Sequence, residues 1–208
     1  MSETTKKPVY KKWWFWLVVL IVIAAIGQGG KDGKQSGESN TSTKGAKAED
    51  AMSNLPADQR KFIEITQDAQ AKARSAENDM QKGGVKAERD KLLCASLPSL
   101  SVKDWIGKVD KIDANSDGKG VVSIEIAKNI LVKTWNNDLS DLMDHTLINP
   151  GTPLFNAASQ LKKGARVKFS GSFFNGGDGD CVKESSLSLS GKVKEPEFIF
   201  RFEGISPL

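Results

Sequence analysis

The sequence is poor in the residues that most metal sites and many hydrolytic enzymes require. Its 208 residues include one His and two Cys, too few for the ligand sets that hold zinc or haem iron in most proteins. It also lacks Gly-x-Ser-x-Gly, a phosphate-binding loop, Cys-x-x-Cys and HExxH. His145 has Ser140 and Asp141 nearby, but closeness in an irregular segment does not build a catalytic triad. We therefore predict a protein that is not an enzyme and needs no cofactor, with His145 in a solvated loop.

No part of the chain carries a large excess of one charge. Residues 1–28 hold 4 Lys and one acidic residue, residues 29–103 hold 13 basic and 11 acidic residues, and residues 104–208 hold 13 basic and 14 acidic residues. Nonspecific binding of nucleic acid needs clustered cations without partners. The small basic surplus lies at the N-terminal end, so the charge pattern argues against a nucleic-acid partner.

An apolar run near the N-terminus indicates a membrane segment. Residues 13–27 contain no charged residue, start with Trp-Trp-Phe-Trp and follow the basic tail of residues 1–12. As a helix, residues 13–26 span roughly 21 Å, so interfacial Trp and Lys side chains must help to cover a core of about 30 Å. The positive-inside rule predicts a cytoplasmic tail, an anchor in the lipid bilayer at residues 13–27 and an extracytoplasmic remainder.

Two alternatives to the anchor remain. A signal peptide cleaved before Gln28 fits the small residues Ala25 and Gly27. A buried soluble helix is the other alternative, although the aliphatic run has no polar face. Residues 28–55 are rich in Gly, Ser, Thr and Lys, a composition typical of a flexible linker.

Residues 56–97 are predicted to be helical, starting at Pro56. Apolar residues recur at spacings of three and four, at Phe62, Ile65, Ala69, Ala73, Ala76 and Met80. The pair Gly83 and Gly84 interrupts this stripe before a second helical piece at residues 85–95. A helical hairpin and one kinked helix both fit, whereas a coiled coil lacks the sustained heptad it needs.

Residues 104–208 change to an alternating pattern that predicts strands. The expected strands are residues 105–112, 121–127, 130–135, 166–174, 185–193 and 198–202, and a helix at residues 153–163 separates the third from the fourth. Residues 121–127 alternate as a half-buried strand does, and most of the Phe residues take core positions. Residues 104–208 therefore form a mainly β domain.

This order of three strands, a helix and two or three further strands resembles the OB-fold, a Greek-key barrel of five or six strands. The segments that carry the resemblance are Trp105-Ile-Gly-Lys-Val, Gly118-Lys-Gly-Val-Val-Ser-Ile-Glu-Ile, Gln160-Leu-Lys-Lys-Gly-Ala-Arg-Val-Lys-Phe-Ser-Gly and Pro196-Glu-Phe-Ile-Phe-Arg-Phe. The third looks like the helix-to-strand passage of the tRNA-anticodon-like OB families. The whole layout is similar to uncharacterised bacterial single-pass membrane proteins with a C-terminal OB domain. The resemblance covers about half the chain and implies a place in the inner membrane, with no catalytic residue.

Two sets of residues are candidates for ligand contact. Trp105 and Trp135 would serve as stacking surfaces if exposed, although a Trp in a strand also packs half-buried against a helix. The oxygen ligands Asp113, Asn115 and Asp117 match the first half of a calcium loop. Ile124 stands where that loop needs a Glu, so a simple turn of Asp, Asn and Gly is the alternative to a metal site.

Cys94 and Cys181 are the only cysteines. An even pair in an oxidising compartment predicts a disulfide, which would contribute about 3–5 kcal/mol by closing a long loop. Two unrelated thiols are the alternative.

These observations predict a membrane-anchored extracytoplasmic module that binds an envelope protein or a small ligand. A cytoplasmic nucleic-acid-binding OB protein is one alternative. A structural or stress-response envelope protein is another.

Overall fold

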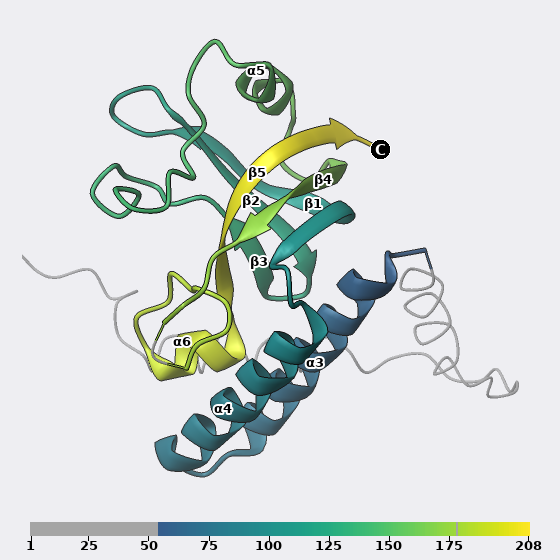
Figure 1. Cartoon of the computed structure of the whole chain (residues 1–208), viewed down its shortest axis with the longest axis vertical. Helices are drawn as coiled ribbons and strands as arrows, with labels where there is room; N and C mark the ends of the chain where they lie inside the picture. Colours follow the sequence, from purple (N-terminus) through teal and green to yellow (C-terminus); the bar gives the residue numbers. More distant parts are fainter. Residues whose placement is uncertain (1–53, 178) are drawn as a thin grey trace, which may run out of the picture. The chain divides into compact units, whose positions relative to one another are not determined.

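The computed structural model describes residues 54–177 and 179–208. The elements in chain order are α3 (Ala57–Ser75), α4 (Asp79–Ser96), β1 (Ser101–Ala114), β2 (Gly120–Ala127), β3 (Ile130–Lys133), α5 (Pro153–Ser159), β4 (Arg166–Phe173), α6 (Leu189–Lys194) and β5 (Glu197–Pro207) (Figure 1). The predicted tail and anchor, and nearly all of the predicted linker, lie outside these residues. Among the helices that the structure describes, none has the length and apolar character needed to cross a membrane.

The five strands close into one barrel in the order β1-β2-β3-β5-β4. β1 is antiparallel to both β2 and β4, and β3 runs parallel to β5. Closure leaves no unpaired strand edge. The structure thus confirms a five-stranded barrel with a helix, α5, between its third and fourth strands, an arrangement consistent with an OB-like barrel.

The barrel closes tightly at Gly171 in β4. The register between β4 and β5 shifts at this residue, and a Cβ atom here would lie 2.1 Å from the carbonyl oxygen of Arg201. Its φ of +156° adds a conformation that other residues rarely adopt. A glycine is therefore required where the two backbones approach most closely.

Aromatic side chains fill the barrel. Phe169, Phe173, Phe198, Phe200 and Phe202 are all buried and meet mainly edge to face, the arrangement that aromatic quadrupoles favour. The predicted Phe core is confirmed for these five residues.

Helix α3 packs against the same core from outside the barrel. The ring of Phe62 lies 5.3 Å from that of Trp105, 5.3 Å from that of Phe173 and 4.9 Å from that of Phe198. Gln59 accepts a hydrogen bond from the backbone N–H of Ile106 at 2.8 Å. Figure 1 shows α5 and the α3–α4 hairpin at opposite ends of the barrel. The predicted helical segment and the predicted barrel therefore share one hydrophobic core.

The helical segment is a hairpin, and its break is not where the glycines suggested. Asn78 caps α4 by accepting a hydrogen bond from the backbone N–H of Gln81 at 3.0 Å. Gly83 and Gly84 lie inside α4. The cap fixes where α4 begins, and the packing of α4 against α3 and α6 offsets the helix propensity lost at the two glycines.

Three further expectations about the strands are corrected. Residues 185–193 do not form a strand, because Ser188 caps the short helix α6 and Val193 is buried. β1 spans Ser101–Ala114 rather than residues 105–112. β2 is buried on both faces over most of its length, since the segment after β3 returns to it and pairs Ile148 with Gly120.

The shared core predicts the effect of Phe62→Ala. We expect this substitution to reduce the free energy of unfolding by about 3–5 kcal/mol, because a large side chain is lost from a packed core. Urea unfolding followed by far-ultraviolet circular dichroism and by Trp fluorescence should show one transition, shifted equally in both signals. A barrel transition that stays unshifted while the helical signal is lost would show that the two parts fold separately.

Candidate functional site

A row of outward-facing side chains crosses three strands of the barrel. Glu125 on β2 pairs with Leu131 on β3, and Leu131 pairs with Glu197 on β5. Side chains alternate between the two faces of a strand, and the neighbours Ile124 and Phe198 are fully buried. The three residues of the row therefore lie side by side on the outer surface.

Asp110 joins this row from β1. The register between β1 and β2 shifts between Val109 and Lys111, so Asp110 occupies a bulge, a feature that redirects a side chain. The result is a concavity of about 230 Å³, which we call the acidic concavity. It is lined by Asp110, Glu125, Asn129, Leu131, Glu195 and Glu197.

Helix α3 holds the rim of the acidic concavity in place. The buried side chain of Gln70 donates hydrogen bonds to the carbonyl oxygens of Asn129 at 3.1 Å and Lys194 at 3.0 Å. Asn129 lies in the turn between β2 and β3, and Lys194 directly precedes Glu195. One amide thus connects α3 to two sides of the concavity.

Three of the four carboxylates have a lysine partner. Lys108 pairs with Glu125 at 2.9 Å, and Lys163 pairs with Asp110 at 3.4 Å. Lys133 pairs with Glu197 at 2.8 Å. Glu195 is exposed and makes no ion pair with the residues described here. Four carboxylates against three lysines leave a negative surplus at this face.

Glu197 stays ionised in spite of its surroundings. Burial works to raise the pKa of this carboxyl, but hydrogen bonds from Lys133 and from the Ser185 hydroxyl outweigh it and hold the pKa below its usual value. A negative charge is therefore kept in the acidic concavity at neutral pH.

The composition of the acidic concavity limits what it can bind. Among the described residues that line it there is no basic and no aromatic side chain, so it offers neither cations for phosphates nor rings for bases to stack on. No group of three or more His, Cys, Asp or Glu in the described part of the chain is arranged to hold a metal ion. Carboxylates on rigid strands remain suited to organic cations such as amines.

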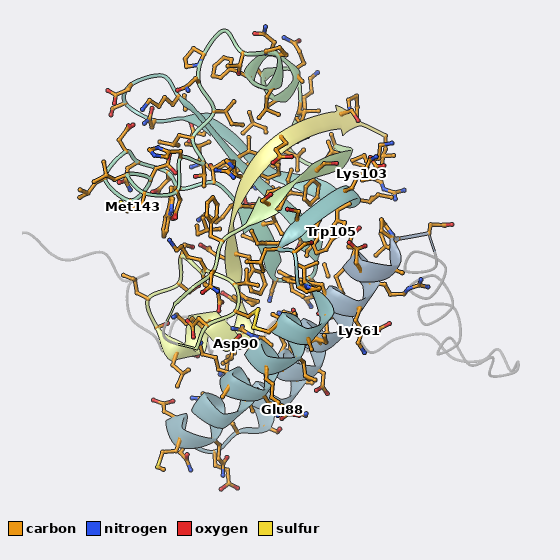
Figure 2. All side chains as sticks on the ribbon, in the orientation of Figure 1. Lys61, Glu88, Asp90, Lys103, Trp105 and Met143 are labelled. Atoms are coloured by element: carbon orange, nitrogen blue, oxygen red, sulfur yellow. A yellow bond between two sulfur atoms is a disulfide. The ribbon has the colours of Figure 1, made fainter. Side chains whose placement is uncertain are left out.

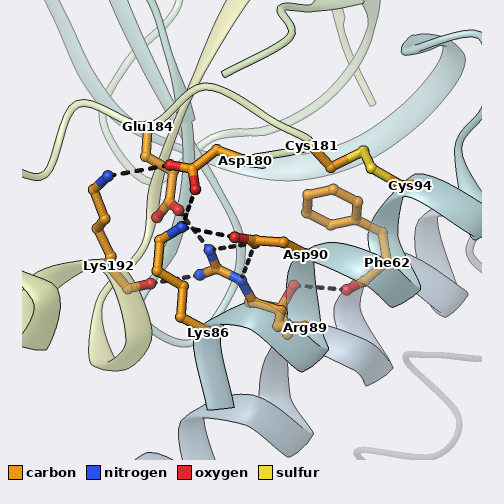
Figure 3. Close-up of polar contacts among 10 residues, drawn as sticks. Phe62, Lys86, Arg89, Asp90, Cys94, Asp180, Cys181, Glu184 and Lys192 are labelled. Carbon is orange, nitrogen blue, oxygen red and sulfur yellow. Dashed lines mark hydrogen bonds and ion pairs between the residues drawn. A yellow bond between two sulfur atoms is a disulfide. The ribbon is translucent and has the colours of Figure 1, made fainter. Parts of the chain in front are cut away.

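A second polar cluster lies beside the disulfide. Cys94 and Cys181 are bonded, with Cα atoms 5.3 Å apart (Figure 3), which confirms the predicted disulfide. It joins the end of α4 to the connection between β4 and β5. We call the disulfide together with the adjoining ionic cluster the α4 clamp. The charged members of the α4 clamp are Lys86, Arg89, Asp90, Asp180, Glu184 and Lys192.

Arg89 is the centre of the α4 clamp. Its side chain is 1% exposed and pairs with Asp90 at 2.7 Å and with Glu184 at 2.5 Å. It also donates a hydrogen bond to the carbonyl oxygen of Lys192 at 2.6 Å. Lys86 links Asp90 to Asp180 (Figure 3). A buried guanidinium with this many acceptors fixes α4 against the connection between β4 and β5.

Glu184 is the member of this cluster whose charge is least well compensated. Its side chain is fully buried, and its Oε2 atom has no hydrogen-bond partner among the described residues. Burial raises the pKa of Glu184, and the attraction of Arg89 only partly offsets it. The spacing of Lys86, Arg89 and Asp90 is typical of a solvated helix face, so the sequence predicted the disulfide of the α4 clamp but not its ionic cluster.

The two candidate Trp residues do not form a common site. Trp105 is 0% exposed and donates its indole N–H to the Asp58 carboxylate at 3.0 Å, so it has no face open for stacking. Figure 2 labels its position. Of the two alternatives for Trp105, the structure favours packing against a helix, because α3 covers it. Trp135 is half-buried and donates its indole N–H to Asp144 at 2.8 Å.

The candidate calcium loop has the hydrogen bonds of a turn. The side-chain oxygen of Asn115 accepts the backbone N–H groups of Asp117 at 3.1 Å and Lys119 at 2.9 Å. Asp113 is exposed and pairs with Lys111 at 2.9 Å. These contacts use Asn115 to close the β1–β2 turn and favour the turn over the metal site.

His145 is exposed in the segment between β3 and α5. The nearby carboxylate of Asp141 accepts hydrogen bonds from Thr146 and Leu147 and is not directed to the imidazole. The geometry gives no triad, and the absence of enzymatic activity stays a prediction.

Comparison with known proteins finds no relative from which this site could be interpreted. The chain matches no protein-family model, no curated protein and no solved structure. The functional argument therefore depends on the acidic concavity and its surroundings alone.

The raised pKa of Glu184 predicts how stability changes with pH. A carboxyl with a raised pKa binds more protons in the folded state, so its contribution to stability is complete below the ordinary Glu pKa of about 4.5 and is lost as pH rises through the folded pKa. We expect Glu184→Gln to remove this loss. The free energy of unfolding of the variant minus that of the unchanged protein should therefore increase as pH rises above about 4.5.

Urea unfolding at a series of pH values from acid to neutral measures this difference. Glu203→Gln, at an exposed carboxylate on β5, is the matched control for the loss of one acidic group. A difference between Glu184→Gln and the unchanged protein that stays constant with pH would contradict the prediction.

Proposed function

We propose that this protein is a membrane-anchored, extracytoplasmic binding module that takes a cationic amine ligand on the outer face of its barrel. The observation that carries the proposal is the acidic concavity, with four carboxylates around about 230 Å³. Its lining comes from four strands, the β2–β3 turn and the residues before β5, so the carboxylates are held before a ligand arrives.

The size of the acidic concavity favours a small cation. Pockets for drug-sized ligands usually measure about 300–1,000 Å³, which is larger than this one. A Lys or Arg side chain of an envelope protein would fit, as would one end of a free polyamine. Both present the same chemistry, ammonium or guanidinium N–H groups that donate to several carboxylate oxygens.

Nucleic-acid binding has less support. In OB-fold proteins the face of strands 2 and 3 binds oligonucleotides or oligosaccharides. Here the matching strands present Glu125 and Leu131 next to Glu197, which repel phosphates and provide no stacking surface.

The disulfide supports the proposed location. Disulfides persist in oxidising compartments outside the cytoplasm, and the anchor predicted at residues 13–27 would place the barrel there. The resemblance to bacterial single-pass membrane proteins with an OB domain agrees with a place in the inner membrane. A purely structural envelope role is the second candidate, favoured by the α4 clamp, which stiffens the domain and contributes no residue to the acidic concavity.

Titration with spermidine tests the binding proposal. Isothermal calorimetry on the full chain in zwitterionic nanodiscs should show binding that weakens with added salt, as expected for a partly exposed charged site. Glu125→Gln combined with Glu195→Gln should weaken binding by about tenfold, the effect of losing charge-assisted hydrogen bonds. Both substitutions leave the pair between Lys133 and Glu197 intact.

Glu203→Gln combined with Glu64→Gln removes two exposed carboxylates elsewhere and is the matched control, with affinity expected to stay unchanged. Equal weakening in both double variants would show only a general charge effect. An absence of spermidine binding at low salt would contradict the proposed amine site. The structural envelope role would then be the better-supported candidate.

Protease treatment of spheroplasts tests the location. We expect digestion of residues 54–208 from outside, and non-reducing mass mapping of the same sample should find Cys94 linked to Cys181. Protection of the domain together with free thiols would contradict the predicted orientation. It would favour the alternative of a nucleic-acid-binding protein that faces the cytoplasm.

A further inference from the structure

The segment between β3 and α5 exposes a cluster of apolar side chains. Leu139 is 85% exposed, Leu142 is 67% exposed and Met143 is 82% exposed. Figure 2 shows Met143 projecting outward from the barrel. Single exposed apolar residues are ordinary, whereas three within five positions form a patch that needs an explanation. We call these three residues and the backbone that carries them the apolar turn.

The apolar turn is held in shape by hydrogen bonds at its base. The buried carboxylate of Asp141 accepts the backbone N–H of Thr146 at 2.6 Å, its hydroxyl at 2.7 Å and the backbone N–H of Leu147 at 2.9 Å. The side-chain oxygen of Asn137 accepts the backbone N–H of Ser140 at 2.9 Å. The exposed apolar residues therefore belong to an ordered structure, and little ordering is left to do when a partner binds.

The spacing within the apolar turn directs its side chains together. The backbone N–H of Asp141 donates to the carbonyl oxygen of Asn137, and that of His145 donates to the carbonyl oxygen of Asp141, as in one turn of helix. Residues three and four apart then share a side. Leu139, Leu142 and Met143 have this spacing.

The charges next to the apolar turn are already paired. Asp138 forms an ion pair with Lys119, and Asp144 forms one with Lys183 at 2.7 Å. Neither sign is left in surplus by these pairs, so the patch can approach an uncharged surface without bringing an unpaired charge into it.

The size of the patch argues against a second copy of this chain as its partner. A stable protein interface buries about 800 Å² on each side and involves about 20–30 residues, far more than three side chains provide. A small patch suffices when a tether already holds it near its target, because the contact is then intramolecular.

The sequence before the described residues predicts such a tether. Residues 13–27 are the apolar run, and residues 28–55 lead from it to α3. A chain of this length and Gly- and Ser-rich composition would span on average roughly 30 Å. The surface that the apolar turn meets most often would then be the bilayer that holds the anchor.

We propose that the apolar turn inserts into the interface of that bilayer and thereby orients the barrel on the membrane. This rests on the membrane anchoring proposed above. A spanning anchor by itself holds the chain at the bilayer. The apolar turn therefore adds the orientation of the barrel and not the attachment. Since the neighbouring lysines are paired, the contact is apolar and does not depend on anionic lipid.

Lipid photocrosslinking on the full chain tests the proposal. The chain is placed in phosphatidylcholine vesicles that contain a phospholipid with a diazirine in its acyl chain, and adducts are mapped by mass spectrometry. We expect adducts on residues 13–27 and on the apolar turn. Leu139→Ser, Leu142→Ser and Met143→Ser together should reduce the adducts on residues 136–147 by about fivefold or more and leave those on residues 13–27 unchanged.

Met80→Ser with Leu187→Ser is the matched control, because both residues are exposed apolar side chains outside the apolar turn. It should leave the adducts on residues 136–147 unchanged. An unchanged urea midpoint and an intact disulfide in the triple variant would show that it is folded. Replacing about a third of the lipid with phosphatidylglycerol should change the adducts on the apolar turn by less than about twofold.

Adducts on residues 13–27 alone would overturn the role of the apolar turn and leave the anchor standing. An absence of adducts on both segments would overturn the anchoring itself. Equal labelling of Met80, Leu187 and the apolar turn would show nonspecific contact and would also overturn the proposal. So would crosslinking of the apolar turn to protein instead of lipid in native membranes, which would identify it as a protein-docking surface.

Discussion

The packing of Phe62 against the aromatic core of the barrel is the contact on which the rest of the structure depends. Its ring meets residues from β1, β4 and β5 and brings α3 onto one end of the barrel. With α3 in place, Gln70 reaches the β2–β3 turn and the residue before Glu195. The same position allows α4 and α6 to pack beside α3. A core contact thus determines the shape of a surface site that Phe62 does not touch.

Carboxylates serve two different purposes in this domain, and their environment decides which. In the α4 clamp, Asp90 and Glu184 surround a buried Arg89, and the cost of burying charge is offset only by their mutual attraction and hydrogen bonds. In the acidic concavity the carboxylates remain partly in water, and their lysine partners approach from outside the lining. Such pairs are weak. The buried cluster therefore holds elements together, whereas the open one can exchange its partners for a ligand.

The proposed binding face and the proposed membrane contact lie on separate parts of the domain. The acidic concavity belongs to the strands and to the residues before β5, and the apolar turn belongs to the segment after β3. They also use opposite chemistry, ionic in one and apolar in the other. A domain that touches the bilayer through one surface could keep the other open to a ligand from the aqueous side.

Local pattern was enough to predict much of this domain. The alternation of residues 121–127 and the stop at Gly164 were sufficient to place β2 and the start of β4, since each depends on neighbours in the chain. The single pair of cysteines, taken with the expected oxidising compartment, predicted the disulfide that the structure contains. The same reasoning failed for the helical break, where a side-chain cap at Asn78 decided, and for residues 185–193, where capping and burial favoured α6 over a strand.

Only the tertiary structure decided where the charges and the tryptophans lie. Arg89 meets Glu184 across 95 positions of sequence, and Trp105 is covered by a helix whose contact residue Asp58 is 47 positions away. The acidic concavity joins residues from β1 to β5 through strand register. Periodicity reports which face of an element is apolar, but it carries no information about which distant element will cover that face. The packing of the whole core decides that, so the sequence determined most of the elements, whereas the fold determined the site.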